Sequence, residues 1–186
     1  MLVLASASPR RREILSRFIK DFHVVPSKAE EECSSGVPEE CAVELARLKA
    51  KEVYSRVGGT VIGADTIVSI DGHILGKPRD EQEAYEMLKL LSGRVHLVTT
   101  GYCIVREGEE ITGSVTTEVK FRELDDELIW AYIRTGEPMD KAGAYGIQGK
   151  AGLFVEWIRG DYYNVVGFPM EIIWKLRELG FDIISR

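Results

Sequence analysis

Short, strongly apolar runs alternate along this 186-residue chain with segments whose apolar residues recur every three or four positions. The first pattern is typical of buried strands, and the second of helices with one face against a core. Strands are predicted over residues 2–5, 22–26, 60–70, 73–78, 96–105, 114–121, 152–158 and 164–168. Helices are predicted over residues 9–18, 38–57, 81–91, 126–135 and 169–179. This alternation predicts a layered α/β domain.

Turn and cap residues sharpen two of these predictions. Ser8 is a helix-capping residue, and Pro9 after it suits the first position of a helix because its backbone angle is already helical. The charged stretch 106–110 is a turn signal between two strand-like runs. Residues 96–105 and 114–121 are therefore predicted to form a long hairpin.

Charge and hydropathy exclude some classes of protein. The chain has a formal charge of −6, whereas surfaces that wrap nucleic acid are usually basic. No apolar run approaches the roughly 18 residues that suggest a membrane span. The arginines near the amino terminus follow the apolar residues, which is the wrong order for a secretory signal. We therefore expect one cytoplasmic domain, residues 1–186, with neither nucleic acid nor membrane as a partner.

The cysteines and histidines show no metal-binding spacing. Cys33, Cys41 and Cys103 are odd in number and form no C-x-x-C pair, so neither a disulfide framework nor a zinc site is indicated. The three histidines are scattered, as is typical of surface or core residues.

Three consecutive arginines, Arg10–Arg12, directly follow the predicted helix start. Free backbone N–H groups and the positive end of the helix dipole attract anions there, beside Ser6, and guanidinium groups pair well with phosphate oxygens. The alternative is an exposed basic turn partly offset by Glu13. Each cation at a helix start costs about 0.3–1 kcal/mol, which favours the phosphate site. At least one of the arginines is expected only to face water.

Asp65 lies in the middle of the most apolar predicted strand, 60–70. A lone carboxylate is costly to bury without a partner. Alternation places its side chain on the opposite face from Thr66, so it could point into a cleft and bind a metal or take a proton from water. An aspartate on the solvated face of the sheet is an equally good interpretation of this residue alone.

Three further charged features have ordinary interpretations as well as functional ones. Lys77 precedes Pro78, which could hold it toward a cleft, although a lysine in a surface turn is the simpler interpretation. Lys49 alone is a lysine on the flank of an amphipathic helix. The run Glu30–Glu32 favours a solvated loop, in which one carboxylate could share a divalent cation with Asp65.

Residues 136–152 are too long and too rich in glycine for a simple connector. Glycine recurs at every third position from 143 to 152, which predicts unusual backbone angles or close approach to a ligand. Gln148 is the one side chain there that donates and accepts hydrogen bonds as a nucleobase edge does. A mobile surface loop is the alternative.

Taken in order, these segments resemble the Maf family of nucleoside-triphosphate pyrophosphatases. The matching pieces are LASASPRR, ELARLKA, GADT, GKPRD, GEPMDKAGAYGIQG and VVGFP, which extend over nearly the whole chain. The resemblance implies an α/β fold with a mixed β-sheet flanked by helices and two lobes around a central cleft. It also implies a divalent metal cation, Mg²⁺ or Mn²⁺, and cleavage of a nucleotide to its monophosphate and pyrophosphate.

The resemblance also assigns roles to individual residues, motif by motif. The catalytic residues would be Asp65 as proton acceptor, Lys77 and Glu31. The metal ligands would be Asp65 and Glu31. The phosphate contacts would come from Ser6, Arg10, Lys49 and Lys77. The residues that read the base would be Arg11, Thr66 and Gln148. To accept a proton Asp65 must be ionised, which we expect Lys77 or the metal to favour.

Residues 140–149 are similar to the family members that act on dTTP and UTP, whereas the branch that acts on 7-methyl-GTP carries an acidic residue near Gln148. A glutamine amide complements the adjacent acceptor and donor of a uracil edge. Two alternatives stay open. One is a nucleotide-binding regulator of septum formation without significant turnover, and the other is a pyrophosphatase for 7-methyl-GTP or another modified nucleotide. The resemblance also allows a homodimer.

Overall fold

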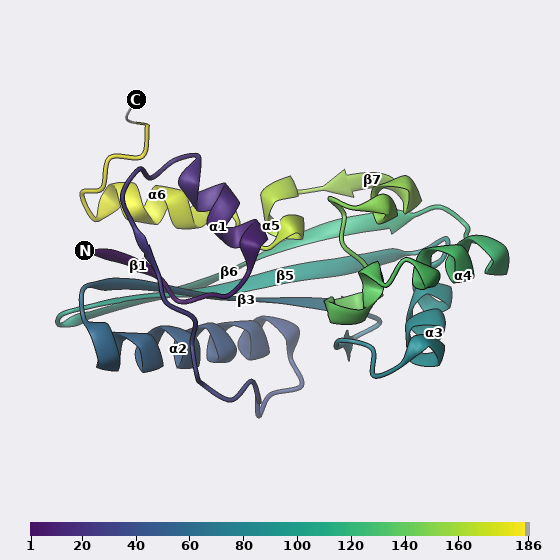
Figure 1. Cartoon of the computed structure of the whole chain (residues 1–186), viewed down its shortest axis with the longest axis horizontal. Coiled ribbons are helices and arrows are strands. Elements are labelled where there is room, and N and C mark those ends of the chain that lie inside the picture. The colour runs from purple at the N-terminus through teal and green to yellow at the C-terminus, as the bar shows by residue number, and fades with distance from the viewer. Residues whose placement is uncertain (185–186) are drawn as a thin grey trace.

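The computed structural model describes residues 1–184 and contains a seven-stranded sheet with helices on both faces (Figure 1). The strands are β1 (Leu2–Leu4), β2 (His23–Val24), β3 (Thr60–Ile70), β4 (His73–Leu75), β5 (Val95–Arg106), β6 (Glu109–Phe121) and β7 (Val155–Arg159). Their order is β2-β1-β3-β5-β6-β7, with β4 beside β3. β1 pairs in parallel with β2 and β3, and the other pairs are antiparallel. The predicted mixed sheet flanked by helices is confirmed.

The helices are distributed over both faces and one end of the sheet. They are α1 (Pro9–Ser16), α2 (Pro38–Val57), α3 (Glu81–Leu91), α4 (Asp126–Arg134), α5 (Tyr162–Val166) and α6 (Met170–Glu178). Three short 3₁₀ segments are η1 (Glu137–Asp140), η2 (Ala142–Ala144) and η3 (Lys150–Phe154). Helix α2 covers one face, α1 and α6 cover the other, and α3 and α4 lie at the far end (Figure 1). In the described residues, no helix is long and apolar enough to cross a membrane.

The predicted starts of the early helices are confirmed. Ser8 caps α1, since its hydroxyl oxygen accepts a hydrogen bond from the Arg11 backbone N–H at 3.3 Å. Pro9 occupies the first helical position. α2 spans the residues predicted for it, because its buried face (Ala42, Ala46, Ala50) repeats at helical spacing.

Two strand predictions near the carboxyl terminus need correction. Residues 164–168 are not a strand, because most of them belong to α5. The carboxylate of Asp161 caps this helix by accepting a hydrogen bond from Tyr163 N at 2.8 Å, and Gly167 ends it at a φ of 124°. Local capping and burial thus override the strand preference of two adjacent valines. In the segment 152–158, regular strand begins only at Val155, after η3.

The expectation that the cysteines form no disulfide is wrong for one pair. Cys33 and Cys41 are bonded, with their Cα atoms 5.3 Å apart. The bond joins the loop before α2 to the first turn of that helix. It was missed because cysteine spacing alone does not show which residues the fold brings together. Cys103 is a buried free thiol.

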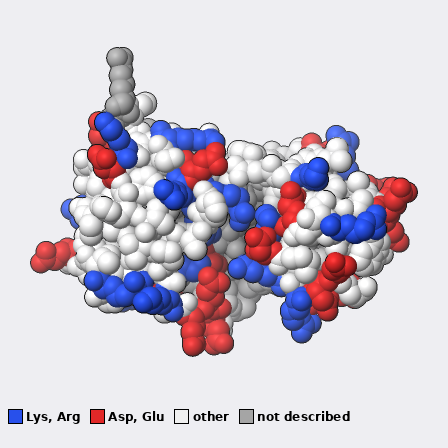
Figure 2. Space-filling view, viewed as in Figure 1, with Lys and Arg blue, Asp and Glu red and all other residues white. Residues whose placement is uncertain are grey.

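Two large apolar cores divide the molecule into two lobes. One core lies under α3, α4 and the 3₁₀ segments, and its members include Leu88, Phe121 and Phe154. The other lies between the sheet, α1 and α6, and includes Leu4 and Phe168. A recess bordered by both basic and acidic side chains separates the two lobes on the surface (Figure 2).

A gap along one edge of β3 positions the functional site. β1 ends opposite Ile62, and β4 begins to pair only at Val68. Within residues 1–184, residues 63–67 of β3 therefore pair with β5 on one side and with no strand on the other. The carboxyl ends of β1 and β4 both lead into this gap, and ligands of open α/β sheets commonly bind where strand ends diverge in this way.

Candidate active site

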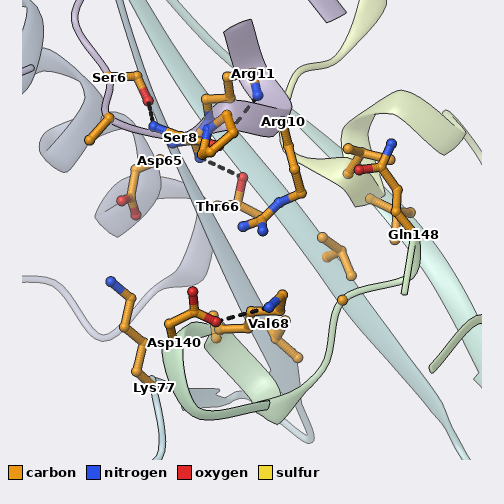
Figure 3. A pocket seen from close by; sticks show the side chains of 18 of the residues that line it. Ser6, Ser8, Arg10, Arg11, Asp65, Thr66, Val68, Lys77, Asp140 and Gln148 are labelled. Carbon is orange, nitrogen blue, oxygen red and sulfur yellow. Dashed lines mark hydrogen bonds and ion pairs between the residues drawn. The ribbon is translucent and has the colours of Figure 1, made fainter. Parts of the chain in front are cut away.

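A cavity of about 440 Å³ opens at the gap in β3, between the two lobes (Figures 2 and 3). Its volume falls in the range of small-molecule sites, roughly 300–1,000 Å³. The residues that the sequence singled out for this site all line the cavity: Ser6, Arg10, Arg11, Glu31, Lys49, Asp65, Thr66, Lys77 and Gln148. Arg12 is exposed and does not line it, as expected for at least one of the three arginines.

Asp65 and Thr66 both reach the cavity although their side chains point to opposite faces of the sheet. Adjacent residues of a strand alternate in direction. Asp65 faces α2, where Lys49 lies, and Thr66 faces α1, where Arg11 lies. Because the edge of β3 is open here, the cavity reaches around the strand to both faces (Figure 3).

Two glycines allow α2 to lie close against the sheet beneath Asp65. A Cβ atom on Gly63 would overlap the Ala46 carbonyl, and one on Gly101 would overlap the backbone of Ala42. Gly101 is also the β5 partner of Asp65. This close approach brings the middle of α2, which carries Lys49, to the Asp65 carboxylate. The two glycines thus help to form the contact between Lys49 and Asp65.

Lys49 joins the two candidate acidic residues. Its ammonium group contacts Asp65 Oδ1 at 3.0 Å and Glu31 Oε1 at 3.1 Å. The side chains of Lys49 and Asp65 are only 11% and 14% exposed, whereas that of Glu31 is 54% exposed. The cation in contact with Asp65 is thus Lys49, a pairing that the sequence did not indicate.

The cluster also shifts the pKa of Glu31. Partial burial disfavours its charged form, but the attraction and hydrogen bond of Lys49, with smaller contributions from Lys77 and Arg11, outweigh burial and lower the pKa below its usual value. Glu31 is therefore a carboxylate at neutral pH. Lys77 itself is exposed and lines the cavity from the segment that follows β4.

The segment between β1 and α1 forms a polar wall. Ser6 is 6% exposed, and its hydroxyl oxygen accepts a hydrogen bond from Ser8 N at 3.1 Å. The side chain of Arg10 extends from α1 into the middle of the cavity (Figure 3). A helix start, a serine and an arginine directed inward form the kind of surface that binds phosphate oxygens.

On the opposite face of β3, Arg11 is fixed by two hydrogen bonds. Its Nε donates to the Gly167 carbonyl at 2.8 Å, and its Nη2 donates to Thr66 Oγ1 at 3.0 Å. Burial lowers the pKa of Arg11, and Asp65 opposes this effect. Arginine remains charged near neutral pH, so this face presents one fixed cation and one hydroxyl.

Part of the cavity wall is apolar. The apolar lining residues include Val68, Val98, Ile147, Val165 and Val166. Gln148 is exposed and lies at the opposite end of the cavity from Asp65, with Arg10 between them (Figure 3). Apolar side chains with a few polar groups among them suit a flat heterocycle.

The glycine-rich loop behaves as predicted at one of its four repeated glycines. Gly143 has a φ of 71°, and a Cβ atom there would meet the side chain of Val68. The other three have ordinary backbone angles and approach atoms of the protein itself, such as the side chain of Lys141 beside Gly146. Close packing of the loop explains most of the repeat.

Two charged residues of this loop were missed from the sequence. Asp140 and Lys141 line the cavity, and Lys141 Nζ contacts Asp140 Oδ1 at 2.9 Å. The hydrogen bond from Lys141 lowers the pKa of Asp140, and Arg10 adds to this effect from across the cavity. The feature of the sequence that could have identified them is the charged pair at the start of the motif DKAGAYGIQG.

The acidic residues fit a divalent cation that is held jointly with a substrate. Among residues 1–184, no group of three His, Cys, Asp or Glu side chains is arranged to hold a metal ion. Asp65 and Glu31 nevertheless converge on one positive charge, the Lys49 ammonium. Mg²⁺ is commonly bound by one or two carboxylates together with substrate phosphates, so this pair of hard oxygen ligands is suitable.

The chain is similar to known proteins in sequence and in fold. A family model described as "Maf-like protein" matches residues 1–178. The chain is 89% identical to the dTTP/UTP pyrophosphatase of Thermococcus gammatolerans, over 100% of both chains. It is 54% identical to the dTTP/UTP pyrophosphatase of Pyrococcus abyssi, over 97% of both. Among solved structures, the Staphylococcus aureus Ham1 protein matches with a TM-score of 0.55 and 16% identity, over 95% of this chain and 97% of that one, which shows likeness of fold.

Proposed function

The chain belongs to the Maf family, and we propose that it hydrolyses dTTP and UTP to the nucleoside monophosphate and pyrophosphate. The observation that supports this most strongly is the convergence of basic groups and carboxylates on one cavity whose wall is partly apolar. The relatives named dTTP/UTP pyrophosphatase, at up to 89% identity, support the choice of nucleotides.

The triphosphate would bind at the polar end of the cavity. Arg10 and Lys77 would neutralise phosphate oxygens, and Ser6 with the backbone N–H groups at the start of α1 would donate hydrogen bonds. Lys49 would reach the phosphates from α2 while it stays close to Asp65. Groups fixed in this way also stabilise the charge that develops on pyrophosphate as it leaves.

Asp65 would accept the proton of the attacking water. Its carboxylate is mostly buried and is held by Lys49 on a rigid strand, so its position is defined before substrate binds. Glu31 would lie beside the same water or hold the cation with Asp65. The water would attack the α-phosphorus, and the bond from that phosphorus to the bridging oxygen of pyrophosphate would break.

We further propose a divalent cation, Mg²⁺ or Mn²⁺, as cofactor, held by Asp65 and Glu31. When bound, the cation would neutralise phosphate charge and make the phosphorus more electrophilic. The protein supplies the two carboxylates and a lysine that balances their charge in its absence.

The base would lie against the apolar part of the wall, and Thr66, Arg11 and Gln148 would supply polar contacts. Location in the cytoplasm, a single domain over residues 1–186, a homodimer, and the lack of nucleic-acid or membrane partners stay predictions from the sequence.

Release of pyrophosphate from a panel of nucleotides tests the proposed function. The purified protein, with Mg²⁺ or Mn²⁺, is expected to release pyrophosphate from dTTP and UTP and to need the metal. If activity were highest on 7-methyl-GTP, the protein would belong instead to the branch of the family that acts on that nucleotide. Nucleotide binding without pyrophosphate release would favour a regulator and would contradict the enzyme proposal.

A further inference from the structure

A continuous chain of hydrogen bonds extends from the cavity into the interior behind Thr66. Arg11 Nη2 lies 3.0 Å from Thr66 Oγ1, which lies 2.9 Å from Thr100 Oγ1. Thr100 Oγ1 lies 3.3 Å from the backbone carbonyl oxygen of Asn164. The chain thus links α1, β3, β5 and α5, and Thr100 and Asn164 are both fully buried.

The groups at the two ends set the direction of these hydrogen bonds. A guanidinium only donates, so Thr66 Oγ1 accepts from Arg11. A carbonyl only accepts, so the Thr100 hydroxyl donates to Asn164. A hydroxyl has a single hydrogen, which leaves Thr100 none to give to Thr66. In the bond between the two threonines, Thr66 is therefore the donor.

This direction fixes what Thr66 offers to a ligand. Its hydrogen points to Thr100 and one of its lone pairs accepts from Arg11, so only acceptor capacity is left toward the cavity. Thymine and uracil carry an N–H at N3, whereas cytosine has a lone pair there. An acceptor at this place attracts the first two bases and repels the third.

The surroundings of Thr100 keep the arrangement fixed. The side-chain amide of Asn164 donates to the Val98 carbonyl at 3.0 Å and to Thr117 Oγ1 at 2.9 Å, which anchors α5 to β5 and β6. Because Thr100 is fully buried, water has no access to it as a substitute partner.

We propose that Thr100 is a positioning residue for base selection. It holds the Thr66 hydroxyl as an acceptor, so that the site takes the N3–H of thymine or uracil and rejects cytosine. The inference rests on the proposed function in one respect, since it takes Thr66 as a residue that contacts the base.

Thr100→Val tests the proposal, because valine has nearly the shape of threonine but cannot accept the Thr66 hydrogen. The released hydrogen can then turn toward the cavity and donate to N3 of cytosine. The ratio of kcat/KM for dTTP to that for dCTP is expected to exceed tenfold in the wild type and to fall at least tenfold in Thr100→Val. Thr100→Ser, which restores the hydroxyl, is expected to keep the wild-type ratio within threefold.

An unchanged ratio in folded Thr100→Val would overturn the proposal, and so would a wild-type enzyme that does not discriminate between dTTP and dCTP. Thermal unfolding checks that the variants fold, and Thr100→Ala removes the same hydroxyl if valine does not fit. Wild-type protein that turns over no nucleotide would contradict the proposed function instead. In that event calorimetric Kd values for dTMP and dCMP, on the same proteins and with the same tenfold criterion, decide the inference separately.

Discussion

The two faces of β3 meet the same cavity with different chemistry. On the α2 face, Asp65, Lys49 and Glu31 form a charged and partly exposed cluster. On the opposite face, the half-buried Thr66 and the buried Thr100 belong to a chain of hydrogen bonds in which Arg11 is the charged member and the others are neutral. One peptide step along the strand thus separates a region suited to metal and water from a region suited to a base, and the phosphate contacts from Lys49 and Arg10 come from both sides.

The difference shows how a short stretch of strand can serve two purposes. Charged groups need solvent or counter-charges to offset the cost of burial, so the charged cluster can remain partly exposed. Hydrogen bonds between neutral groups keep one fixed arrangement when no water competes for their donors and acceptors. The open edge at residues 63–67 permits both, because the cavity reaches each face from the same side of the strand.

Removing the base on the charged face is expected to give the largest effect. Asp65→Asn should lower kcat for dTTP by about 10²–10⁴, the usual contribution of a general base, with little change in binding. Pyrophosphate release measures kcat, and calorimetry measures nucleotide affinity. Asp71→Asn is the matched control, because Asp71 lies just beyond the end of the same strand, pairs with Arg94 and does not line the cavity. Turnover of Asp65→Asn within a few-fold of the wild type would exclude Asp65 as the base.

On the face of Thr66 and Thr100, the stability of the protein should decrease in acid because of the buried His96. This buried residue shares the face of Thr100 and lies 2.6 Å from the Tyr145 hydroxyl. Burial lowers its pKa to about 4, against an ordinary value of 6.5, so the unfolded chain binds the proton more readily. The free energy of unfolding should fall as the pH falls from 6.5 to 4, by about 3 kcal/mol from this group.

Denaturant unfolding of wild type and His96→Gln across this range isolates the contribution, since the carboxylates titrate in both proteins. The wild type should lose more stability on acidification than the variant. Parallel pH profiles would show that His96 does not resist protonation in the folded protein.

The charged wall at the start of α1 can be tested with neighbouring arginines. Arg10→Gln should raise KM for dTTP about 10- to 100-fold, because a charged hydrogen bond contributes about 1.5–3 kcal/mol and each 1.4 kcal/mol is tenfold. Arg12→Gln makes the same change on the exposed side of the helix and should leave KM unaltered. Equal effects of the two substitutions would indicate general electrostatic attraction rather than a contact made by Arg10.

The packing that brings Lys49 to Asp65 gives a smaller and mainly structural prediction. Gly101→Ala would press a methyl group into the backbone of α2, so the free energy of unfolding should fall by about 1–3 kcal/mol. Gly36→Ala, where a Cβ meets no atom within 4 Å, is the control for stability measured in denaturant. Equal stability of the two variants would mean that α2 does not depend on the close approach.

Much of the fold follows from local patterns in the sequence. The long apolar run of β3 and the amphipathic α2 agree with the residues predicted for them, because burial on a regular face leaves a clear period. α5 was mistaken for a strand because its valines favour strands, while the cap at Asp161 that decides the matter lies just outside the run.

The site was less accessible to such reasoning. Asp65 was noticeable as a charge in an apolar strand, and the arginines as cations at a helix start. Thr100 is one polar residue in an ordinary strand, and its role depends on neighbours 34 and 64 residues away in the chain. The contact between Lys49 and Asp65 likewise requires the packing of α2 on the sheet, which no local pattern describes.

A crystal structure of Asp65→Asn with dTTP and Mg²⁺ tests the division between the two faces most directly. We expect phosphate oxygens in contact with Arg10 and Lys49, and N3 of thymine within hydrogen-bond distance of Thr66 Oγ1. A thymine seated against Asp65, or a triphosphate that contacts neither Arg10 nor Lys49, would contradict the account.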